Sequence, residues 1–350
     1  MPKHLFVRGG VTLNKKAFTL IELLSVIVIL AIISLIATPI ILNIISDARE
    51  ESNKRSVELY ASAVKNAVAT EQLKGNIVTS IGDIDMNKYY DGDVVCEIVI
   101  IGKNNNVYLE DCIVNGNKLD YTYGSHFNTV CMPVETSTTG NVPKGDYVRG
   151  DEYTCEVKEG TYYTFFILSK EGNKVNLIMD SNVRKDGTPV KEENPTDKGL
   201  VAWISKSDYI EAGGTEEEYG NLGNNNKGPL TAMKYLQSAT SSWTNLEEMQ
   251  ISTFKYNNGM IKEMTTFTTY ARMPDKSELF YTEWLTNYMS YSSSYPNRTV
   301  VSGVGGYWIS SARFDSSCNA YSVDRRGGFN NLMANHKNIY GVRPVITLSI

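Results

Sequence analysis

The chain has 350 residues, of which 42% are hydrophobic and 21% are charged, so a globular core is feasible and wholesale disorder is excluded. It carries 34 Lys and Arg against 39 Asp and Glu, a net charge of −5, which argues against a uniformly basic nucleic-acid-binding protein. The length exceeds one average domain and favours two domains, or two domains and a long helix.

The first predicted element is an apolar helix near the N-terminus. Residues 17–46 carry a single charged side chain, Glu22, and Leu23–Ile45 would span roughly 35 Å as a helix, enough to cross a bilayer. The four Lys and Arg residues before it predict a cytoplasmic N-terminus and place everything after Ile45 outside. A signal peptide or a plain membrane anchor are the alternatives, but the apolar stretch is long for a signal peptide.

This helix is predicted to continue beyond the membrane. Apolar residues recur at helical spacing over Val57–Val68, and Gly75 is suited to end the helix. A helix over Phe18–Lys74 would be roughly 85 Å long. We expect a membrane half, 18–46, and an amphipathic half, 47–74, that carries a packed domain.

The segment from Lys15 to Leu24 reads Lys-Lys-Ala-Phe-Thr-Leu-Ile-Glu-Leu-Leu and closely resembles the start of type IV pilins and pseudopilins. In that family a membrane peptidase cuts before the Phe, the new N-terminus is methylated, and a Glu guides assembly. The resemblance implies a leader of residues 1–17, cleavage between Ala17 and Phe18, N-methylation of Phe18, and an assembly carboxylate at Glu22. The family usually has Gly where this chain has Ala17.

Two residues of the apolar helix are expected to act in assembly. Glu22 would cost on the order of 2–3 kcal/mol deep in lipid, and in a filament it would meet the cationic N-terminus of a neighbouring subunit. The alternative leaves Glu22 at the interface beside Lys15 and Lys16. Pro39 removes one helical donor and clashes with the carbonyl of Leu35, so the helix is expected to bend or melt there during assembly; a simple kink is the alternative.

The middle region, 75–132, is predicted to form a small antiparallel pilin-like β domain. Val94–Ile101 and Val107–Val114 are rich in β-formers and flank a Gly-Lys-Asn-Asn-Asn turn, which indicates a hairpin. A second turn at Asn115–Gly116 leads into a predicted strand over Leu119–Tyr123.

The hairpin brings two cysteines together. Pairing Ile101 with Val107 sets Cys96 opposite Cys112, where oxidation outside the membrane would form a disulfide; two free buried thiols are the alternative. The same register sets like charges opposite each other at residues 97 and 111, which is unfavourable.

A linker is predicted at residues 133–145, which are rich in Thr, Ser, Gly and Pro. Cys131 and Cys155 bracket it, and a bridge between them would staple two domains at their junction. Pairing of Cys155 with Cys318 stays open from the sequence.

The region 146–350 is predicted to be a mixed α+β domain. Strands are followed by a short helix after Pro229, another after Pro274, and further short strands. The predicted strands are Tyr153–Val157, Thr161–Ser169, Lys174–Met179, Tyr307–Ser310 and Val342–Leu348.

Three segments of this region resemble landmarks of C-type-lectin-like domains of the formylglycine-generating-enzyme type. They are Ala271–Pro274 with Glu278, Tyr307–Ser311, and Gly341–Val345. The resemblance implies a lectin-like fold, in which Arg343 is more often a structural arginine than a ligand.

No enzyme site is predicted. The cysteine pair of the formylglycine-generating enzymes is missing, because Cys318 is the one late cysteine, and no metal-ligand spacing or nucleophile elbow occurs. A calcium-loop pattern over Asp83–Asp91 lacks the Gly and Glu of that loop, and Tyr295 stands where calcium-dependent lectins carry a Glu. We therefore predict no catalytic residue, cofactor or metal.

Aromatic residues among Ser, Asn and Gly suggest a candidate ligand surface, made of Tyr295, Trp308, Tyr321 and Arg325. The alternative is that these aromatics fill the core. A modest excess of basic residues after Ser311 suits DNA or anionic glycans, although local charge balancing is favoured.

The sequence predicts an α+β protein with a long N-terminal membrane and pilin helix packed on a small antiparallel sheet, followed by a C-type-lectin-like domain. We expect a minor or tip type IV pilin-like filament subunit with an adhesive or recognition domain. The expected partners are prepilin peptidase, other pilin subunits, the membrane before assembly and a surface glycan or protein; DNA is less favoured. The expected location is a single-pass cytoplasmic membrane precursor, then an extracellular filament. The alternatives are a pseudopilin of a secretion or DNA-uptake machine and a membrane-anchored enzyme.

Overall fold

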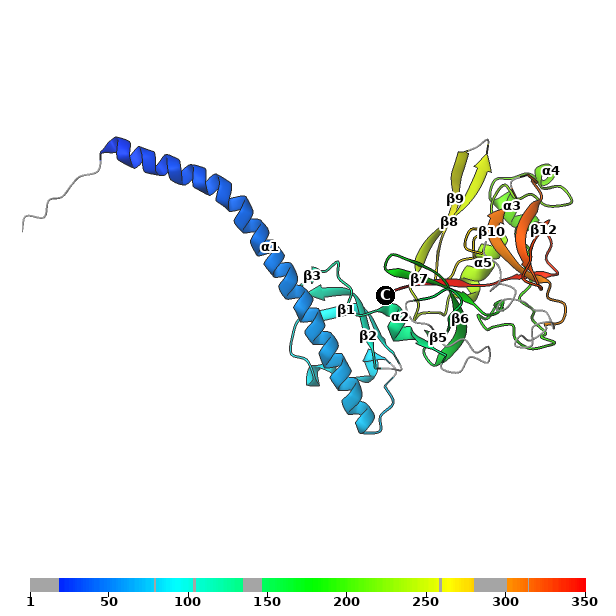
Figure 1. Ribbon diagram of the computed structural model, residues 1–350, viewed down its shortest axis with the longest axis horizontal. Coiled ribbons are helices and arrows are strands. Elements are labelled where there is room, and N and C mark those ends of the chain that lie inside the picture. The colour runs from blue at the N-terminus through cyan, green and yellow to red at the C-terminus, as the bar shows by residue number, and fades with distance from the viewer. Residues whose placement is uncertain are drawn as a thin grey trace, which may run out of the picture. The chain divides into compact units, whose positions relative to one another are not determined.

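The computed structural model describes residues 19–78, 80–102, 105–134, 147–257, 260–279, 301–313 and 315–350. By their contacts, residues fall into two compact units, Met1–Glu58 and Leu59–Ile350. A long N-terminal helix is followed by a mixed region with several antiparallel sheets, so the predicted α+β class is confirmed (Figure 1).

Helix α1 spans Leu20–Leu73, close to the predicted range. Every large apolar side chain between Leu20 and Ile45 is at least 42% exposed, and the helix is long and apolar enough to cross a membrane by length and composition. The helix ends as expected at Gly75, which adopts φ 86° and donates its N–H to the Gln72 carbonyl.

The amphipathic half of α1 buries the predicted apolar face. Its buried side chains in the second unit are Tyr60, Ala61, Ala63, Val64, Ala67 and Val68. Polar contacts tie the same half to the chain around the small sheet, since Lys65 Nζ donates to the Tyr123 hydroxyl at 3.2 Å. Nearby, Tyr60 packs edge-on against Tyr90 with ring centroids 5.1 Å apart.

The small sheet has the antiparallel order β1-β2-β3, with β1 at Val94–Ile101, β2 at Val107–Val114 and β3 at Asn117–Lys118. Both strands of the predicted hairpin and its register are confirmed. The predicted strand over Leu119–Tyr123 is wrong. The turn at Asn115–Gly116 is so tight that β3 pairs with β2 directly after it, and this pairing stops after two residues. Tyr123 later makes an isolated bridge to Leu109.

The unfavourable pair of like charges is avoided in this hairpin. The ladder keeps one register on both sides of Glu97 and Asp111 but does not include that pair. Asp111 adopts φ 52°, and its carboxylate lies 2.7 Å from Lys118 Nζ on β3. The backbone conformation at Asp111 therefore places its carboxylate beside Lys118 in place of the like-charged Glu97.

The largest sheet is antiparallel with the order β14-β7-β6-β5-β4. Its strands β5, β6 and β7 match the predicted ones. Strand β4 was not predicted, and its residues were assigned to the end of the small domain. Since β4 pairs with β5, this sheet begins before the predicted linker, of which residues 135–145 lie outside the described residues. The strands are β4 (Cys131–Pro133), β5 (Glu152–Lys158), β6 (Thr161–Glu171), β7 (Lys174–Met179) and β14 (Val345–Ser349).

A third sheet has the order β12-β11-β10-β13, in which β13 runs parallel to β10. The predicted strand over Val342–Leu348 is split between two sheets at Arg343–Pro344, since proline has no N–H to donate to a ladder. The strands are β10 (Gly306–Ala312), β11 (Asn319–Asp324), β12 (Phe329–Met333) and β13 (Tyr340–Val342).

Two strands that the sequence did not predict, β8 (Met249–Asn257) and β9 (Met260–Thr269), form a separate hairpin. The helix predicted after Pro229 is confirmed as α5 (Leu230–Ala239). The helix predicted after Pro274 does not form through Leu279; this stretch makes a turn in which Glu278 folds back onto Arg272. The other helices are α2 (His126–Val130), α3 (Lys206–Glu211) and α4 (Glu216–Tyr219), with 3₁₀ turns at Ile81–Asp83 and Met86–Lys88.

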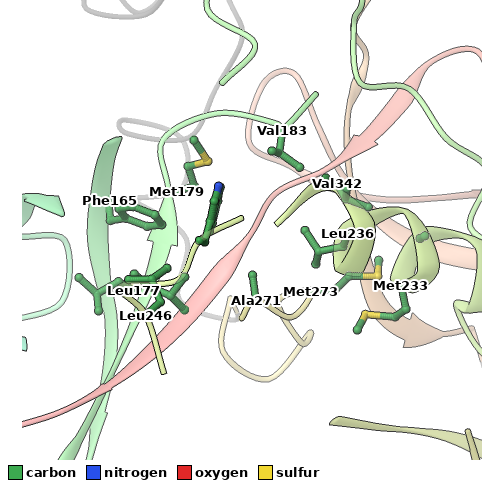
Figure 2. Packing of buried hydrophobic residues seen from close by; sticks show 14 of the residues in the cluster. Phe165, Leu177, Met179, Val183, Met233, Leu236, Leu246, Ala271, Met273 and Val342 are labelled. Carbon is green, nitrogen blue, oxygen red and sulfur yellow. The ribbon is translucent and has the colours of Figure 1, made fainter. Parts of the chain in front are cut away.

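The five-stranded sheet is buried on both faces, as four consecutive buried residues of β6, Phe165–Leu168, require. Phe165 and Leu177 belong to a core that also contains α5, and Figure 2 shows them beside Leu246. Side chains of the other face, including Phe166, pack with the four-stranded sheet. The first core also takes in Ile100 and Tyr108, so β1 and β2 share it with the C-terminal sheet.

Candidate functional site

The first candidate site is the N-terminal segment. Ala17 and Phe18 lie outside the described residues. Glu22 lies in the first turn of α1, where its Oε2 accepts the Thr19 N–H and the Thr19 hydroxyl, both at 2.8 Å, while the Glu22 N–H donates to Thr19 Oγ1 at 3.3 Å. This is a capping box, and the Thr-x-x-Glu spacing that marks it was readable in the sequence but was not used.

The capping bonds of Glu22 are local and exposed, so its carboxylate can exchange them for another donor. Pro39 lies inside α1 and supplies no N–H for the carbonyl of Leu35. One residue earlier, the Thr38 hydroxyl donates to the Ser34 carbonyl at 2.6 Å. Glu22 and Pro39 both lie on one continuous helix whose large apolar side chains are exposed in this half.

The structure joins the four candidate cysteines as two disulfides. Cys96 and Cys112 are bonded across the β1–β2 hairpin, and Cys131 and Cys155 are bonded between β4 and β5. Cys318 carries a free thiol beside Asn319, so it does not pair with Cys155.

A buried polar cluster links α2 to the C-terminal sheet. His126 is 2% exposed and stacks on Tyr108 with ring centroids 4.4 Å apart. Its Nε2 lies 2.6 Å from the Asn245 carbonyl, and its Nδ1 lies 3.4 Å from Glu247 Oε1. Glu247 also accepts the Ser349 N–H of β14.

The electrostatics of Glu247 follow from these contacts. Burial raises the pKa of its carboxyl, but hydrogen bonds from His126 and Ser349 outweigh burial, and the pKa lies below its usual 4.5. Lys174 Nζ of β7 lies 3.7 Å from the other carboxylate oxygen. The cluster therefore holds three elements together through one charged acceptor.

The candidate ligand residues do not form one surface. Trp308 is fully buried and donates its indole N–H to the Val201 carbonyl at 2.8 Å, so it belongs to the core and its assignment to a ligand surface is corrected. Tyr321 is half-buried under Lys276, whose Nζ lies 3.9 Å from the ring centroid, and Arg325 is exposed. Tyr295 lies outside the described residues.

The three segments that resemble lectin-like landmarks meet in space. Arg272 and Val345 exchange backbone hydrogen bonds, and the Ser310 N–H donates to the Pro274 carbonyl at 2.9 Å. Tyr307 of β10 pairs with Gly341 of β13. Arg343 is 1% exposed with its guanidinium 4.5 Å from the Tyr307 ring centroid, a structural position.

A groove with a volume of about 1020 Å³ lies between β8, the residues before α5, and the end of β10. No sequence motif marked it, because its lining comes from separate stretches between residues 225 and 317. The lining combines short hydroxyl and amide side chains with apolar side chains and four charged residues. Its lining includes Asn225, Met233, Ile251, Ser252, Thr253, Met273, Asp275, Ser310, Ser311, Ala312 and Arg313.

The charged side chains along the groove are bound by other groups of the protein. Arg272 binds both carboxylate oxygens of Glu278, and Arg313 binds both of Asp315. Asp275 accepts hydroxyl hydrogen bonds that include one from Ser311 at 2.6 Å. Burial raises the pKa of Asp275, but these hydrogen bonds outweigh burial and hold the pKa below its usual value.

Within the described parts of the chain, no three His, Cys, Asp or Glu side chains gather as metal ligands would. The groove instead offers neutral hydrogen-bonding groups beside apolar side chains. This combination suits the binding of an uncharged ligand.

Comparison with known proteins gives one match. Residues 12–38 match the family model of the prokaryotic N-terminal methylation motif, a range that contains Ala17, Phe18 and Glu22. No curated protein and no solved structure matches the chain. Together with the apolar helix near the N-terminus, the motif fits a membrane-anchored precursor that becomes part of an extracellular filament. It supports a pilin- or pseudopilin-type precursor that prepilin peptidase processes and that assembles with other pilins as a structural subunit.

Proposed function

We propose that the chain is a minor or tip subunit of a type IV pilin-like filament and that its C-terminal body recognises a ligand. The observation that carries this proposal is the methylation motif at residues 12–38, which leads directly into an exposed apolar helix. The unit that begins at Leu59 and ends at Ile350 is much larger than the apolar half of the helix. A body of this size on every subunit would crowd a helical array, which favours a minor or terminal position.

In this proposal, cleavage between Ala17 and Phe18 leaves a methylated amine on Phe18, directly before the Thr19–Glu22 capping box. During assembly, Glu22 exchanges its bonds to Thr19 for the N-terminal amine of a neighbouring subunit. The Glu22 carboxylate and the amine of the neighbouring subunit then balance each other's charge as the apolar helices pack together. Pro39 weakens the helix where it has to adapt to its neighbours.

The C-terminal body is the recognition domain of this proposal, and its fold is lectin-like. The meeting of the segments around Arg272, Tyr307 and Val345 supports the lectin-like fold. The groove beside β8 supports a site for a surface glycan or a protein.

A pseudopilin of a secretion or DNA-uptake machine is the second candidate. The methylation motif supports this candidate as well. The basic residues after Ser311, however, argue against DNA uptake. Arg313 is paired with Asp315 and Arg343 is buried, which leaves as exposed basic residues Arg325 and Arg326 in the turn after β11, and Lys337 before β13. DNA binding would be salt-sensitive, which separates it from binding of a neutral ligand. A membrane-anchored enzyme is less favoured still.

Mass spectrometry of the mature N-terminus from native membranes and sheared filaments tests the proposal. We expect a chain that begins at N-methylated Phe18. Glu22→Ala is expected to keep this processing but to remain in the membrane, whereas Glu50→Ala on the exposed continuation of the same helix is expected to enter filaments. An uncut chain, or a Glu22→Ala variant that assembles normally, would overturn the proposal.

A further inference from the structure

The groove lies against the edge of strand β8. Its lining includes Ile251, Ser252 and Thr253, three consecutive residues of that strand. Successive side chains of a strand point to opposite faces, so a cavity against one face would touch alternate residues only. Contact with three in a row indicates that the groove runs along the edge, and β9 contributes no lining residue, so it is the edge away from β9.

Strand β8 has β9 as its one neighbour among the described strands. A two-stranded ribbon is marginally stable by itself, and a third strand adds both main-chain hydrogen bonds and side-chain contacts. The outer edge of β8 is therefore the place where an added strand would extend this sheet.

The wall of the groove opposite β8 is formed by the end of strand β10. It contains the consecutive residues Ser310–Arg313, at and beyond the end of β10. Strand β13 accompanies β10 only through Gly306–Trp308, and the pairing of β10 with β11 shifts between Trp308 and Ala312. The groove therefore has an extended backbone segment along each side.

The wall beyond β10 is held in place before any ligand arrives. The Asn225 side-chain amide donates to the carbonyls of Arg313, Ser316 and Asn319 at 2.6–3.0 Å. A preorganised wall lowers the entropy cost of binding.

The chemistry of the lining defines the ligand. An anionic ligand would find no free cation, because Arg272 and Arg313 are already paired with carboxylates. Asp275 keeps its negative charge, but both of its carboxylate oxygens already accept hydrogen bonds from serine side chains. Hydroxyl groups on the walls suit main-chain amides and small polar side chains. The apolar base of the groove consists of the half-buried Ile251 together with Met233 and Met273, which are only 1% and 2% exposed, so an apolar side chain would contact mainly Ile251.

We propose that this groove binds an extended, uncharged peptide segment of a partner protein, which adds to β8 as a third strand. Main-chain pairing supplies the affinity, and every second side chain of the peptide faces the apolar base. The inference rests on the proposed function, because it names the class of ligand that the recognition domain takes.

The test uses the full-length protein in detergent and a library of short random peptides displayed on phage. We expect enriched peptides to be uncharged and to alternate apolar and small polar residues. Each enriched peptide is then made with N-methyl groups on its odd or on its even residues. One of these two forms is expected to lose affinity about ten- to a hundredfold, because it loses two or more hydrogen bonds to β8, while the other keeps its affinity.

Two variants locate the binding. Ala312→Trp is expected to abolish peptide binding by filling the groove, and Thr268→Trp, at an exposed position of β9 outside the groove, is expected to bind normally. Peptide binding should also slow amide hydrogen exchange in β8. Equal affinity of both N-methylated forms, or unchanged binding to Ala312→Trp, would overturn the inference.

A neutral glycan that binds the groove in place of peptides, and that Ala312→Trp blocks, would also overturn it. In that case the recognition function itself would stand. Processing at Phe18 and assembly through Glu22 are measured separately, so a failure of the proposed filament role is distinguishable from a failure of the peptide site.

Discussion

The buried carboxylate of Glu247 allows a stability effect to be worked out from the structure. Replacing it in Glu247→Gln keeps the size of the side chain but turns the hydrogen bond from the Ser349 N–H into a bond with a neutral amide, and it removes the carboxylate charge beside His126 and Lys174. Bonds to charged groups contribute about 1.5–3 kcal/mol each and neutral ones about 1 kcal/mol. We therefore expect a loss of about 2 kcal/mol in the free energy of unfolding at neutral pH.

The effect is expected to depend on pH. The pKa of Glu247 in the folded protein lies below 4.5, so its stabilisation is fully present above about pH 4.5 and is lost as the pH falls through the lowered pKa. The gap between wild type and Glu247→Gln should thus narrow in acid, because the wild-type carboxylate becomes protonated. The neutral variant has no charge there to lose.

Urea unfolding of the detergent-solubilised chain, followed by tryptophan fluorescence, measures this gap. Trp203, Trp243 and Trp308 are buried in the C-terminal body and report its unfolding. Glu248→Gln, at the exposed neighbouring position, is the matched control and should change stability by less than about 0.5 kcal/mol. A gap that is absent at neutral pH, or that is equally large at about pH 3, would refute the reasoning.

Three further predictions follow from other contacts. The double variant Cys131→Ser, Cys155→Ser should lose about 3 kcal/mol, from a loop with sequence separation 24, in the same urea assay; an unchanged midpoint under oxidising conditions would contradict it. Gly306→Ala should unfold the C-terminal body, because an added Cβ would lie 1.9 Å from the Val323 carbonyl, whereas Gly116→Ala, with open space around it, should lose only about 1–2 kcal/mol; similar losses for both would count against the argument. Arg272→Met should lose about 3 kcal/mol by leaving the half-buried Glu278 carboxylate without its bidentate partner, and the further change Glu278→Gln should restore part of that loss; no restoration would sink this account.

Local patterns allowed several elements to be predicted with their register. The hairpin of β1 and β2 is readable because its β-rich runs are separated by a short polar turn, and its hydrogen-bonded register follows from the length of that turn. Helix α1 is readable because its apolar run is long, and Gly75 marks its end.

Other elements depend on partners that lie far away in the sequence. Strand β4 has three residues and finds its partner across the predicted linker, and the β8–β9 hairpin carries many polar residues. The aromatic pattern suggested a ligand surface at Trp308, but an aromatic residue beside Ser and Gly looks the same in sequence whether it is buried or exposed. The groove was not predictable, because its lining comes together only when β8, α5 and β10 pack.

The sequence by itself determined the N-terminal part of this protein. The methylation motif, Glu22 and the apolar helix work through spacing along one continuous segment, so the residues in order are sufficient to recognise them. Only the tertiary structure decided how the C-terminal body presents its surface. Whether Trp308 is exposed or buried against Val201, and which edge of β8 faces a groove, depend on residues distant in the chain. Folding brings these residues together to bury the five-stranded sheet on both faces, and that packing has no short-range signature in the sequence.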